Sequence, residues 1–305
     1  MKRRILLIFV DGIGLGDDDP SINPFATAQT PTLNALAGGK RWLRDAGRQK
    51  TERSFFIPTD PRMGVPGRPQ SASGQAAILT GRNVPALIGE HYGPRPNEAI
   101  RELLAQDNFF KQVVAQGKSA ALIEAYPPQF HRAINSGKRL RSSYQQAVHE
   151  AGLPLLGEDS IYAGEALAVD WTGEGWRTQL GYHDTPIYSP FEAGQRMVAI
   201  ARRYDFAFFS HWITDMLGHR GTLNEGIRLL ETFDRVMEGA LDAWDDREGL
   251  MIITSDHGNF EDMSHSKHTE NDVPTVIIGA EREAFAEKIH TLSDLVPAMS
   301  AYLFS

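Results

Sequence analysis

Carboxylate and imidazole side chains recur in the second half of the chain at spacings that suit a metal site. Asp215 and His219 are four residues apart, Asp256 and His257 are adjacent, and His268 follows. Residues four apart lie on the same face of a helix, so Asp215 and His219 can approach one ion. Mixed Asp and His ligation without thiolate suits borderline cations such as zinc, manganese or iron. These residues predict a metal centre.

Short apolar runs precede these side chains and are typical of buried strands. The runs span residues 5–10, 205–210 and 250–254. The first leads into Asp11, the second leads on to Asp215 and His219, and the third leads into Asp256 and His257. A single Asp after a strand is commonly a turn residue or a helix cap. Because ligands of open α/β sheets gather at the carboxyl ends of strands, the three cases together predict one shared rim.

A nucleophile is expected in the small-residue segment 66–82, where Ser71 and Ser73 open a helix-compatible apolar stretch. A helix N-terminus favours an anionic phosphate. A serine hydroxyl is not ionised at neutral pH, but a hydroxyl bound to a divalent cation is acidified as metal-bound water is. The alternative is that both serines only cap the helix.

The order of elements predicts an α/β fold. Strands alternate with helices, which are expected at 97–116, from the capping boxes Ser189–Glu192 and Thr222–Glu225, and at 292–303; further strands are expected at 119–124 and 276–278. Such alternation builds a mostly parallel central sheet covered on both faces, a three-layer α/β/α sandwich.

Residues 127–188 interrupt this alternation and are rich in Gly, aromatic and charged residues, among them Arg139 and Arg141. Two interpretations compete: a solvated connecting subdomain, or a small inserted cap that contacts substrate above the metals. Long insertions in compact domains are usually functional, which favours the cap. The expected division is a core of residues 1–126 and 189–305 with an inserted cap of residues 127–188.

Composition indicates a compact enzyme that acts on small molecules. The chain has 305 residues, 41% of them hydrophobic, a net charge of −8 and no cysteine. The charge offers no basic face for nucleic acid, and no apolar segment is long enough to cross a membrane. The lack of cysteine fits a cytoplasmic location, and the short apolar run after Met1 lacks the cleavage site of a signal peptide. Oligomeric state leaves no sign in the sequence.

Taken together, these segments resemble the alkaline phosphatase superfamily, in particular its cofactor-independent phosphoglycerate mutase and phosphopentomutase branch. The motifs are Val10–Gly14, Asn23–Asn34, Asp215–Gly221, Ser255–Asn259 and Lys267–Pro274. The resemblance covers the first 85 residues and residues 190–305, and it is poor between about 127 and 188.

The resemblance implies two divalent metal ions, Zn²⁺ or Mn²⁺. Asp11, Asp256 and His257 would hold one ion together with the oxygen of Ser71. Asp215, His219 and His268 would hold the other. Ser71 is in the position of the nucleophile, with Ser73 as the alternative. His211, Asn259 and Thr269 are candidates for supporting the ligands, and Asn259 also for binding phosphate.

Two departures from the family pattern bear on the activity that the resemblance implies. Relatives of the mutase type carry His where this chain has Gln75, and Ser71 lacks the x-Pro-x-Arg context that sulfatases require. The stretch between Ser71 and Asp215 is also short for the large transferase domain of the phosphoglycerate mutases. The expected function is therefore a di-metal phosphoester hydrolase, a phosphatase or phosphodiesterase, that forms phosphoserine on a small phosphorylated substrate. The alternatives are a phosphomutase and a non-catalytic metal-binding protein.

Overall fold

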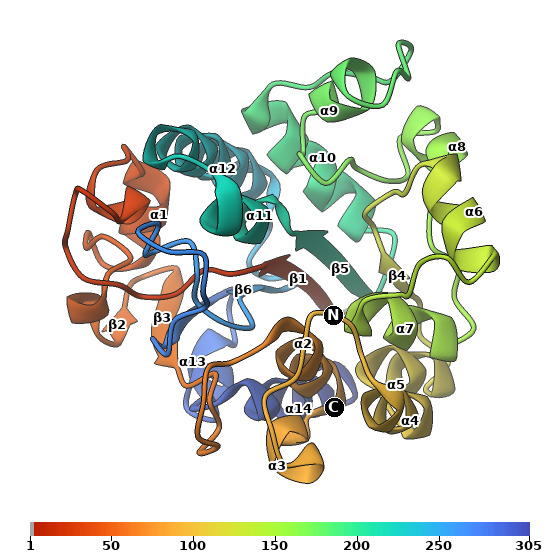
Figure 1. The fold of residues 1–305 in the computed structure, drawn as a ribbon, viewed down its shortest axis with the longest axis horizontal. Coiled ribbons are helices and arrows are strands. Elements are labelled where there is room, and N and C mark those ends of the chain that lie inside the picture. Colours follow the sequence, from red (N-terminus) through yellow and green to blue (C-terminus); the bar gives the residue numbers. More distant parts are fainter. Residues whose placement is uncertain (1–2) are drawn as a thin grey trace.

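A central sheet of seven strands forms the middle layer in a computed structural model, which describes residues 3–305 (Figure 1). The strands lie side by side in the order β2-β3-β7-β6-β1-β5-β4. Their bounds are β1 Arg4–Val10, β2 Gln49–Lys50, β3 Ser54–Thr59, β4 Ala120–Leu122, β5 Phe206–His211, β6 Gly249–Thr254 and β7 Val273–Ile278. Helices cover both faces of the sheet, so the predicted α/β class with three layers is confirmed.

Each face of the sheet has its own helical layer (Figure 1). One layer contains α2 Ser71–Thr80, α3 Val84–Ile88, α4 Glu98–Gln106, α5 Phe109–Ala115, α7 Ser143–Glu150, α13 Arg282–Ala286 and α14 Leu295–Leu303. The other contains α1 Pro31–Leu36, α10 Pro190–Ala201 and α12 Leu223–Ala243. The capping boxes at Ser189 and Thr222 begin α10 and α12 as predicted. Short 3₁₀ turns span Pro24–Ala26, Arg44–Ala46 and Leu292–Asp294.

The strand β1 shows why its sequence is a continuous apolar run. Successive side chains of a strand point to opposite faces of the sheet. Ile5, Leu7 and Phe9 pack into the core under α2 and α14, whereas Leu6, Ile8 and Val10 pack into the core under α10 and α12. Because both faces of the sheet are covered, the strand does not alternate between apolar and polar residues. The run therefore stays apolar until Asp11.

The sheet is mixed, which corrects the prediction that it is mostly parallel. The strands β6, β1, β5 and β4 are parallel to one another, but β7 runs antiparallel to both β6 and β3, and β2 pairs antiparallel with β3. A parallel neighbour requires a crossover connection, usually a helix. Residues 255–272 instead form a loop that stays at one end of the sheet, so β7 re-enters in the opposite direction.

The helix predicted over 97–116 is two helices, α4 and α5, that meet at Asp107 and Asn108. Asn108 has an extended backbone, and its side-chain oxygen accepts from the backbone N–H of Lys111 at 3.1 Å. Its Nδ2 also donates to the carbonyl of Leu104 at 2.9 Å. One Asn thus satisfies both a helix end and a helix start, so the apolar spacing continues across a break.

Residues 127–188 contain α7 and three further helices, α6 Pro128–Asn135, α8 Glu158–Tyr162 and α9 Glu174–Thr178. The helix α7 packs against α2 and α4, and Ser143 donates to the carbonyl of Ala72 at 2.7 Å. The helices α6 and α8 lie beside β4 at the edge of the molecule (Figure 1). A small apolar cluster of its own lies in and beside this segment and consists of Ala125, Ile161, Ala166, Ala168 and Trp176. The division into core and cap stays a prediction.

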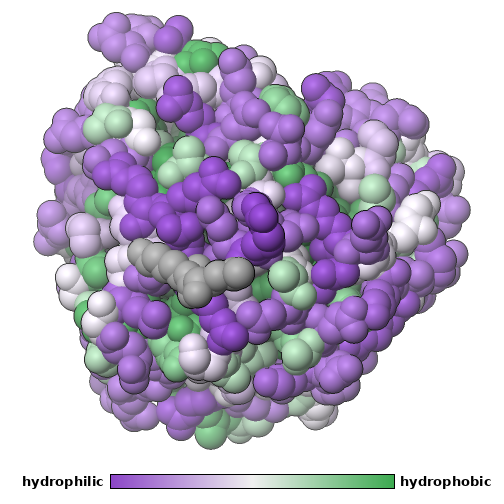
Figure 2. Space-filling view, turned by 180° about the vertical axis from the view of Figure 1, so that it is seen from behind, coloured by the Kyte–Doolittle hydropathy of each residue, from purple (hydrophilic) through white to green (hydrophobic). Residues whose placement is uncertain are grey.

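Hydrophilic residues cover most of the face seen from behind, with hydrophobic residues scattered between them (Figure 2). Scattered apolar residues are normal on a protein surface. Among residues 3–305, no helix combines the length and the apolar character that a membrane span requires.

Candidate metal centre

The carboxyl ends of three adjacent parallel strands bring the acidic and imidazole side chains together. Asp11 follows β1, Asp256 and His257 follow β6, and β5 leads into α11 Ile213–Arg220, which carries Asp215 and His219. The loops are tied to one another, since Asp11 N donates to the carbonyl of His211 at 2.8 Å. The shared rim predicted from the three apolar runs is present.

Ser71 is the first residue of α2 and reaches this rim. Its Oγ lies 3.0 Å from Nε2 of His257, and the residue is 8% exposed. A helix N-terminus carries partial positive charge from its unpaired N–H groups. An anionic group that contacts Ser71 would therefore lie in a favourable field.

Ser73, the alternative nucleophile, has a different environment. It is fully buried, and its Oγ donates to the carbonyl of Gln70 at 3.2 Å and accepts from the N–H of Tyr92 at 3.0 Å. Its own N–H donates to the carbonyl of Tyr92 at 2.9 Å. Ser73 thus fastens the segment around Tyr92 to the start of α2, and its hydroxyl is already engaged.

Asp215, His219 and His268 form one group of possible ligands, with one atom of each within 4.8 Å of the others. Nε2 of His219 lies 3.4 Å from Oδ1 of Asp215, Nε2 of His268 lies 3.7 Å from the same oxygen, and the two Nε2 atoms are 3.3 Å apart. Asn259 holds Asp215 by donating Nδ2 to its Oδ1 at 2.8 Å and to its carbonyl at 3.1 Å.

The tautomers of the two histidines follow from their other ring nitrogens. Nδ1 of His219 lies 2.8 Å from the carbonyl of Ser266, and Nδ1 of His268 lies 2.9 Å from the carbonyl of Pro69. A carbonyl only accepts, so each Nδ1 must carry the proton, and each neutral ring presents a bare Nε2. With both rings neutral, two bare nitrogens and a carboxylate oxygen converge, which is repulsive unless a cation lies between them or a proton is held between His219 and Asp215, whose hydrogen bond raises the pKa of His219.

Asp11, Asp215 and His257 form a second group within the same 4.8 Å limit. Nε2 of His257 lies 3.5 Å from Oδ1 of Asp11 and 3.6 Å from Oδ2 of Asp256. Asp215 therefore belongs to both groups geometrically, whereas the resemblance assigns it to one ion only. Asp256 stands beside the second group through its contact with His257.

Gln75 bridges two buried carboxylates, Asp11 of this second group and the neighbouring Asp256. Its Nε2 donates to Oδ2 of Asp11 at 3.3 Å and to Oδ2 of Asp256 at 3.2 Å. The residue that departs from the mutase pattern therefore contacts both candidate ligands. Its position one helical turn after Ser71 places Gln75 on the same face of α2, which is the sequence signal for such a role.

The electrostatics of the carboxylates call for a cation. Burial, followed by the charges of Asp256 and Asp215, raises the pKa of Asp11 well above its ordinary value. Burial and the charge of Asp215 raise the pKa of Asp256 to about 7. Oδ1 of Asp11 is buried and has no hydrogen-bond partner among residues 3–305. Like charges crowded out of water are costly, and either a proton or a divalent ion offsets them.

Burial favours the neutral, metal-binding form of His257 and His268, whereas the hydrogen bond with Asp215 raises the pKa of His219 above its ordinary value in the metal-free site. Burial lowers the pKa of His257 to about 4, and burial together with the charge of His257 lowers that of His268 to about 4. Burial acts to raise the pKa of Asp215, but the hydrogen bond with His219 and the charges of His257 and His219 outweigh it and leave the pKa below its ordinary value. Neutral imidazoles and an ionised carboxylate are ligands. The residues present therefore fit a divalent cation.

All seven residues predicted as ligands or nucleophile lie at this rim; their individual roles stay predictions. Of the supporting candidates, Asn259 contacts Asp215, and Thr269 donates to Glu261. The side chain of His211 lies elsewhere: its ring stacks on Trp171 with centroids 3.7 Å apart, and its Nδ1 bonds to the carbonyl of Val169 at 2.7 Å. Glu261, which no sequence motif indicated, is buried beside the rim.

The chain is similar in sequence to known enzymes. The model of the family described as the metalloenzyme superfamily matches residues 192–304. A 2,3-bisphosphoglycerate-independent phosphoglycerate mutase from Ruegeria sp. is 36% identical over 245 residues, which is 74% of this chain and 46% of that enzyme. The chain spans half or less of the length of the curated relatives it matches.

Solved structures share the fold. The alkaline phosphatase of the Antarctic bacterium TAB5 aligns with a TM-score of 0.54 at 12% identity, covering 99% of this chain and 97% of that chain. Phosphoglycerate mutase of Leishmania mexicana, solved at low cobalt concentration, aligns with a TM-score of 0.51 at 14% identity, covering 99% of this chain and 95% of that chain. With its family match, its sequence relatives and this fold, the chain is a metalloenzyme of the alkaline phosphatase superfamily.

Proposed function

We propose that the chain is a metal-dependent phosphomutase, which moves a phosphoryl group between two positions of a small phosphorylated metabolite through a phosphoserine at Ser71. One observation carries the proposal. Imidazole nitrogens and carboxylate oxygens converge beside Ser71, whose Oγ lies 3.0 Å from Nε2 of His257. The names of the sequence relatives support the mutase over the hydrolase that the sequence analysis placed first.

The metal ligands in this proposal are the two groups that share Asp215, together with Asp256. Divalent cations bound there, zinc or manganese, would acidify the serine hydroxyl and offset charge on the phosphoryl oxygens. The seven residues are Asp11, Ser71, Asp215, His219, Asp256, His257 and His268.

The protein's own side chains orient the transfer. Ser71 is fixed at the first position of α2, so its Oγ points at the rim and the helix N-terminus attracts the phosphate. Asn259 holds Asp215, and Gln75 holds Asp11 and Asp256, which keeps the carboxylates from rotating as charge moves between oxygens. Catalysis of phosphoryl transfer rests mainly on such positioning and on electrostatic stabilisation.

A second candidate is the phosphohydrolase, and one observation favours it. The side chains of His219 and Asp215 are 32% and 20% exposed, so solvent reaches this side of the rim. A mutase must exclude water from its phosphoenzyme, because a phosphoserine that meets water is hydrolysed. Closure of the site around substrate would be required for mutase activity.

One experiment tests both candidates. The purified protein, loaded with Mn²⁺ or Zn²⁺, is incubated with 3-phosphoglycerate and followed by ³¹P NMR, which resolves the 2- and 3-phosphate esters and inorganic phosphate in one spectrum. The proposal expects interconversion of the esters with little inorganic phosphate. Release of phosphate as the main product, here or from an aryl phosphate, would favour the hydrolase, and no reaction across a panel of mono- and diesters would contradict both.

A further inference from the structure

Glu261 is a buried carboxylate that connects the loops on which the candidate ligands are carried. It follows His257 by four residues and is 1% exposed. Its Oε2 accepts from the backbone N–H of Gly14 at 3.0 Å and from the backbone N–H of Asn259 at 2.8 Å. This one oxygen thus ties the loop after β1, which carries Asp11, to the loop after β6.

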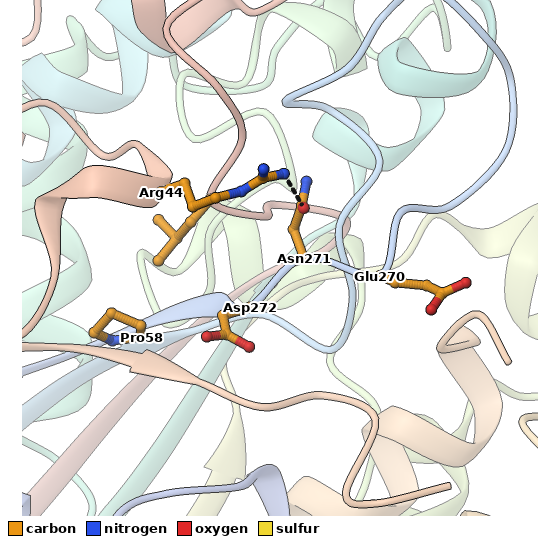
Figure 3. Close-up of a pocket in the computed structure, with 6 residues that line it drawn as sticks. Arg44, Pro58, Glu270, Asn271 and Asp272 are labelled. Carbon is orange, nitrogen blue, oxygen red and sulfur yellow. Dashed lines mark hydrogen bonds between the residues drawn. The ribbon is translucent and has the colours of Figure 1, made fainter. Parts of the chain in front are cut away.

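The other oxygen of Glu261 binds the segment that leads into β7. Oε1 accepts from Nδ2 of Asn271 at 3.0 Å and from the hydroxyl of Thr269. Asn271 is held on its far side as well, because its Oδ1 accepts from Arg44 at 2.7 Å, at the edge of a cavity of about 200 Å³ (Figure 3). His268 is the residue before Thr269, so this oxygen fixes the third ligand-bearing segment.

The loops approach Glu261 as closely as backbone can. A Cβ added at Gly14 would lie 2.2 Å from Oε1 of Glu261, and a Cβ added at Gly258 would lie 2.2 Å from the same atom. Real Cβ atoms do not come within 3.0 Å of a neighbour. Glycine on both sides therefore lets one carboxylate accept four hydrogen bonds, which satisfies its lone pairs.

We propose that Glu261 is the positioning residue that pre-forms the metal centre, because it sets the separation between the loop after β1, which carries Asp11, and two segments of loop 255–272, which carry the Asp256–His257 pair and His268. The inference rests on the proposed function, since it takes these residues to hold cations. Outer residues that orient metal ligands typically contribute 10- to 100-fold to metal affinity.

The geometry predicts different effects for two substitutions. In Glu261→Gln, the amide oxygen can still accept from Gly14 and Asn259, but the amide NH₂ faces the donor of Asn271, so only the His268 segment is released. In Glu261→Ala, all three segments lose their common acceptor. We therefore expect cation affinity to fall about 10-fold in the first variant and about 100-fold in the second.

The test is a calorimetric titration of the intact, chelator-treated protein with Mn²⁺ alone. Glu270→Gln is the matched control, because it removes the same charge from an exposed residue of the same segment. Thermal unfolding of each metal-free variant checks that it folds. If either Glu261 variant fails to fold, Asn271→Ala, which removes one of the four donors, is titrated in its place and should lose about 10-fold.

A second readout separates positioning from a general loss of structure. Excess Mn²⁺ should return the kcat of Glu261→Gln to near that of the parent, because bound cations draw the loosened ligands back. Equal affinity in Glu261→Gln and Glu270→Gln would overturn the inference while leaving the proposed function intact. A parent protein that binds no divalent cation would instead overturn the proposed function, and this inference with it.

Discussion

Ser71 and His257 face each other across the rim, with Oγ and Nε2 3.0 Å apart, although they come from a helix start and from a strand end. The same Nε2 lies 3.5 Å from Asp11 and 3.6 Å from Asp256. A cation bound by these side chains would lie next to the serine hydroxyl. The pair therefore links the candidate nucleophile directly to the candidate ligands.

Replacing Ser71 by Ala should abolish turnover and leave metal content nearly unchanged, because the other six candidate ligands remain. Asp256→Ala should lose metal and activity together. Ser73→Ala is the control: loss of its hydrogen bonds to Gln70 and Tyr92 should lower the free energy of unfolding by about 1 kcal/mol, and activity should persist. Metal analysis, steady-state kinetics and urea unfolding measure these effects. An inactive Ser73→Ala beside an active Ser71→Ala would identify the other hydroxyl as the nucleophile.

Gln75→Leu should destabilise the metal-free protein. The substitution removes the amide that donates to both Asp11 and Asp256, so two buried carboxylates each lose a donor. An unsatisfied buried polar group costs about 1–3 kcal/mol, which urea unfolding in the presence of a chelator would measure. Gln116→Leu, at an exposed position, is the control. Equal stability of the two variants would show that the amide bridge contributes nothing to the fold.

Arg95 follows Gly93, which packs against the start of α2. A Cβ on Gly93 would be 3.2 Å from the backbone N of Ser71, so the chain around residues 92–95 passes directly over the start of α2. The positive charge of Arg95 reaches Asp11, whose raised pKa it opposes, and Arg139, whose pKa burial and Arg95 lower. An anionic substrate that contacts both Arg95 and Arg139 would reduce the repulsion between them, so we expect these two residues to take part in substrate binding.

Arg139→Ala should accordingly raise KM about 10-fold and change kcat little, because a residue that binds substrate equally in ground and transition states affects only KM. The guanidinium of Arg139 packs over the ring of Phe130, 4.8 Å from its centroid, so it is presented from residues 127–188. Arg132→Ala, an exposed arginine of the same segment, is the control. Steady-state kinetics with the phosphate ester found active would measure both, and an unchanged KM in Arg139→Ala would remove this residue from the substrate site.

The sequence predicted the features that follow from local pattern. Apolar runs that end in Asp or Asp-His predicted the strands and the rim, because a buried parallel strand must be apolar on both faces until it reaches the surface. The direction of β7 was not predictable in this way, since an apolar strand looks the same in either direction and only the path of residues 255–272 decides it. Glu261 was missed because its role depends on the loop around Gly14, which is distant in sequence, and on how its own loop folds back to place Asn271 beside it.

The pH dependence of stability should reveal Glu124, a buried carboxyl beyond the end of β4. Burial raises its pKa to about 7, and hydrogen bonds from Ser210 and Tyr126 only partly oppose this. The folded pKa lies above the unfolded one, so the native state holds the proton more tightly. Its contribution to stability is therefore full below pH 4.5, falls as the pH rises to about 7, and stays lost above that.

Glu124→Gln, which is neutral at every pH, should remove this dependence. Relative to the parent, its free energy of unfolding should rise by on the order of 3 kcal/mol between pH 4.5 and pH 8, since one pKa unit corresponds to about 1.36 kcal/mol. Urea unfolding with chelator present would measure the difference without a contribution from metal binding. Glu102→Gln, at an exposed position of α4, should instead show the same pH dependence of the free energy of unfolding as the parent. If Glu124→Gln also shows the pH dependence of the parent, the carboxyl of Glu124 is not protonated preferentially in the folded state.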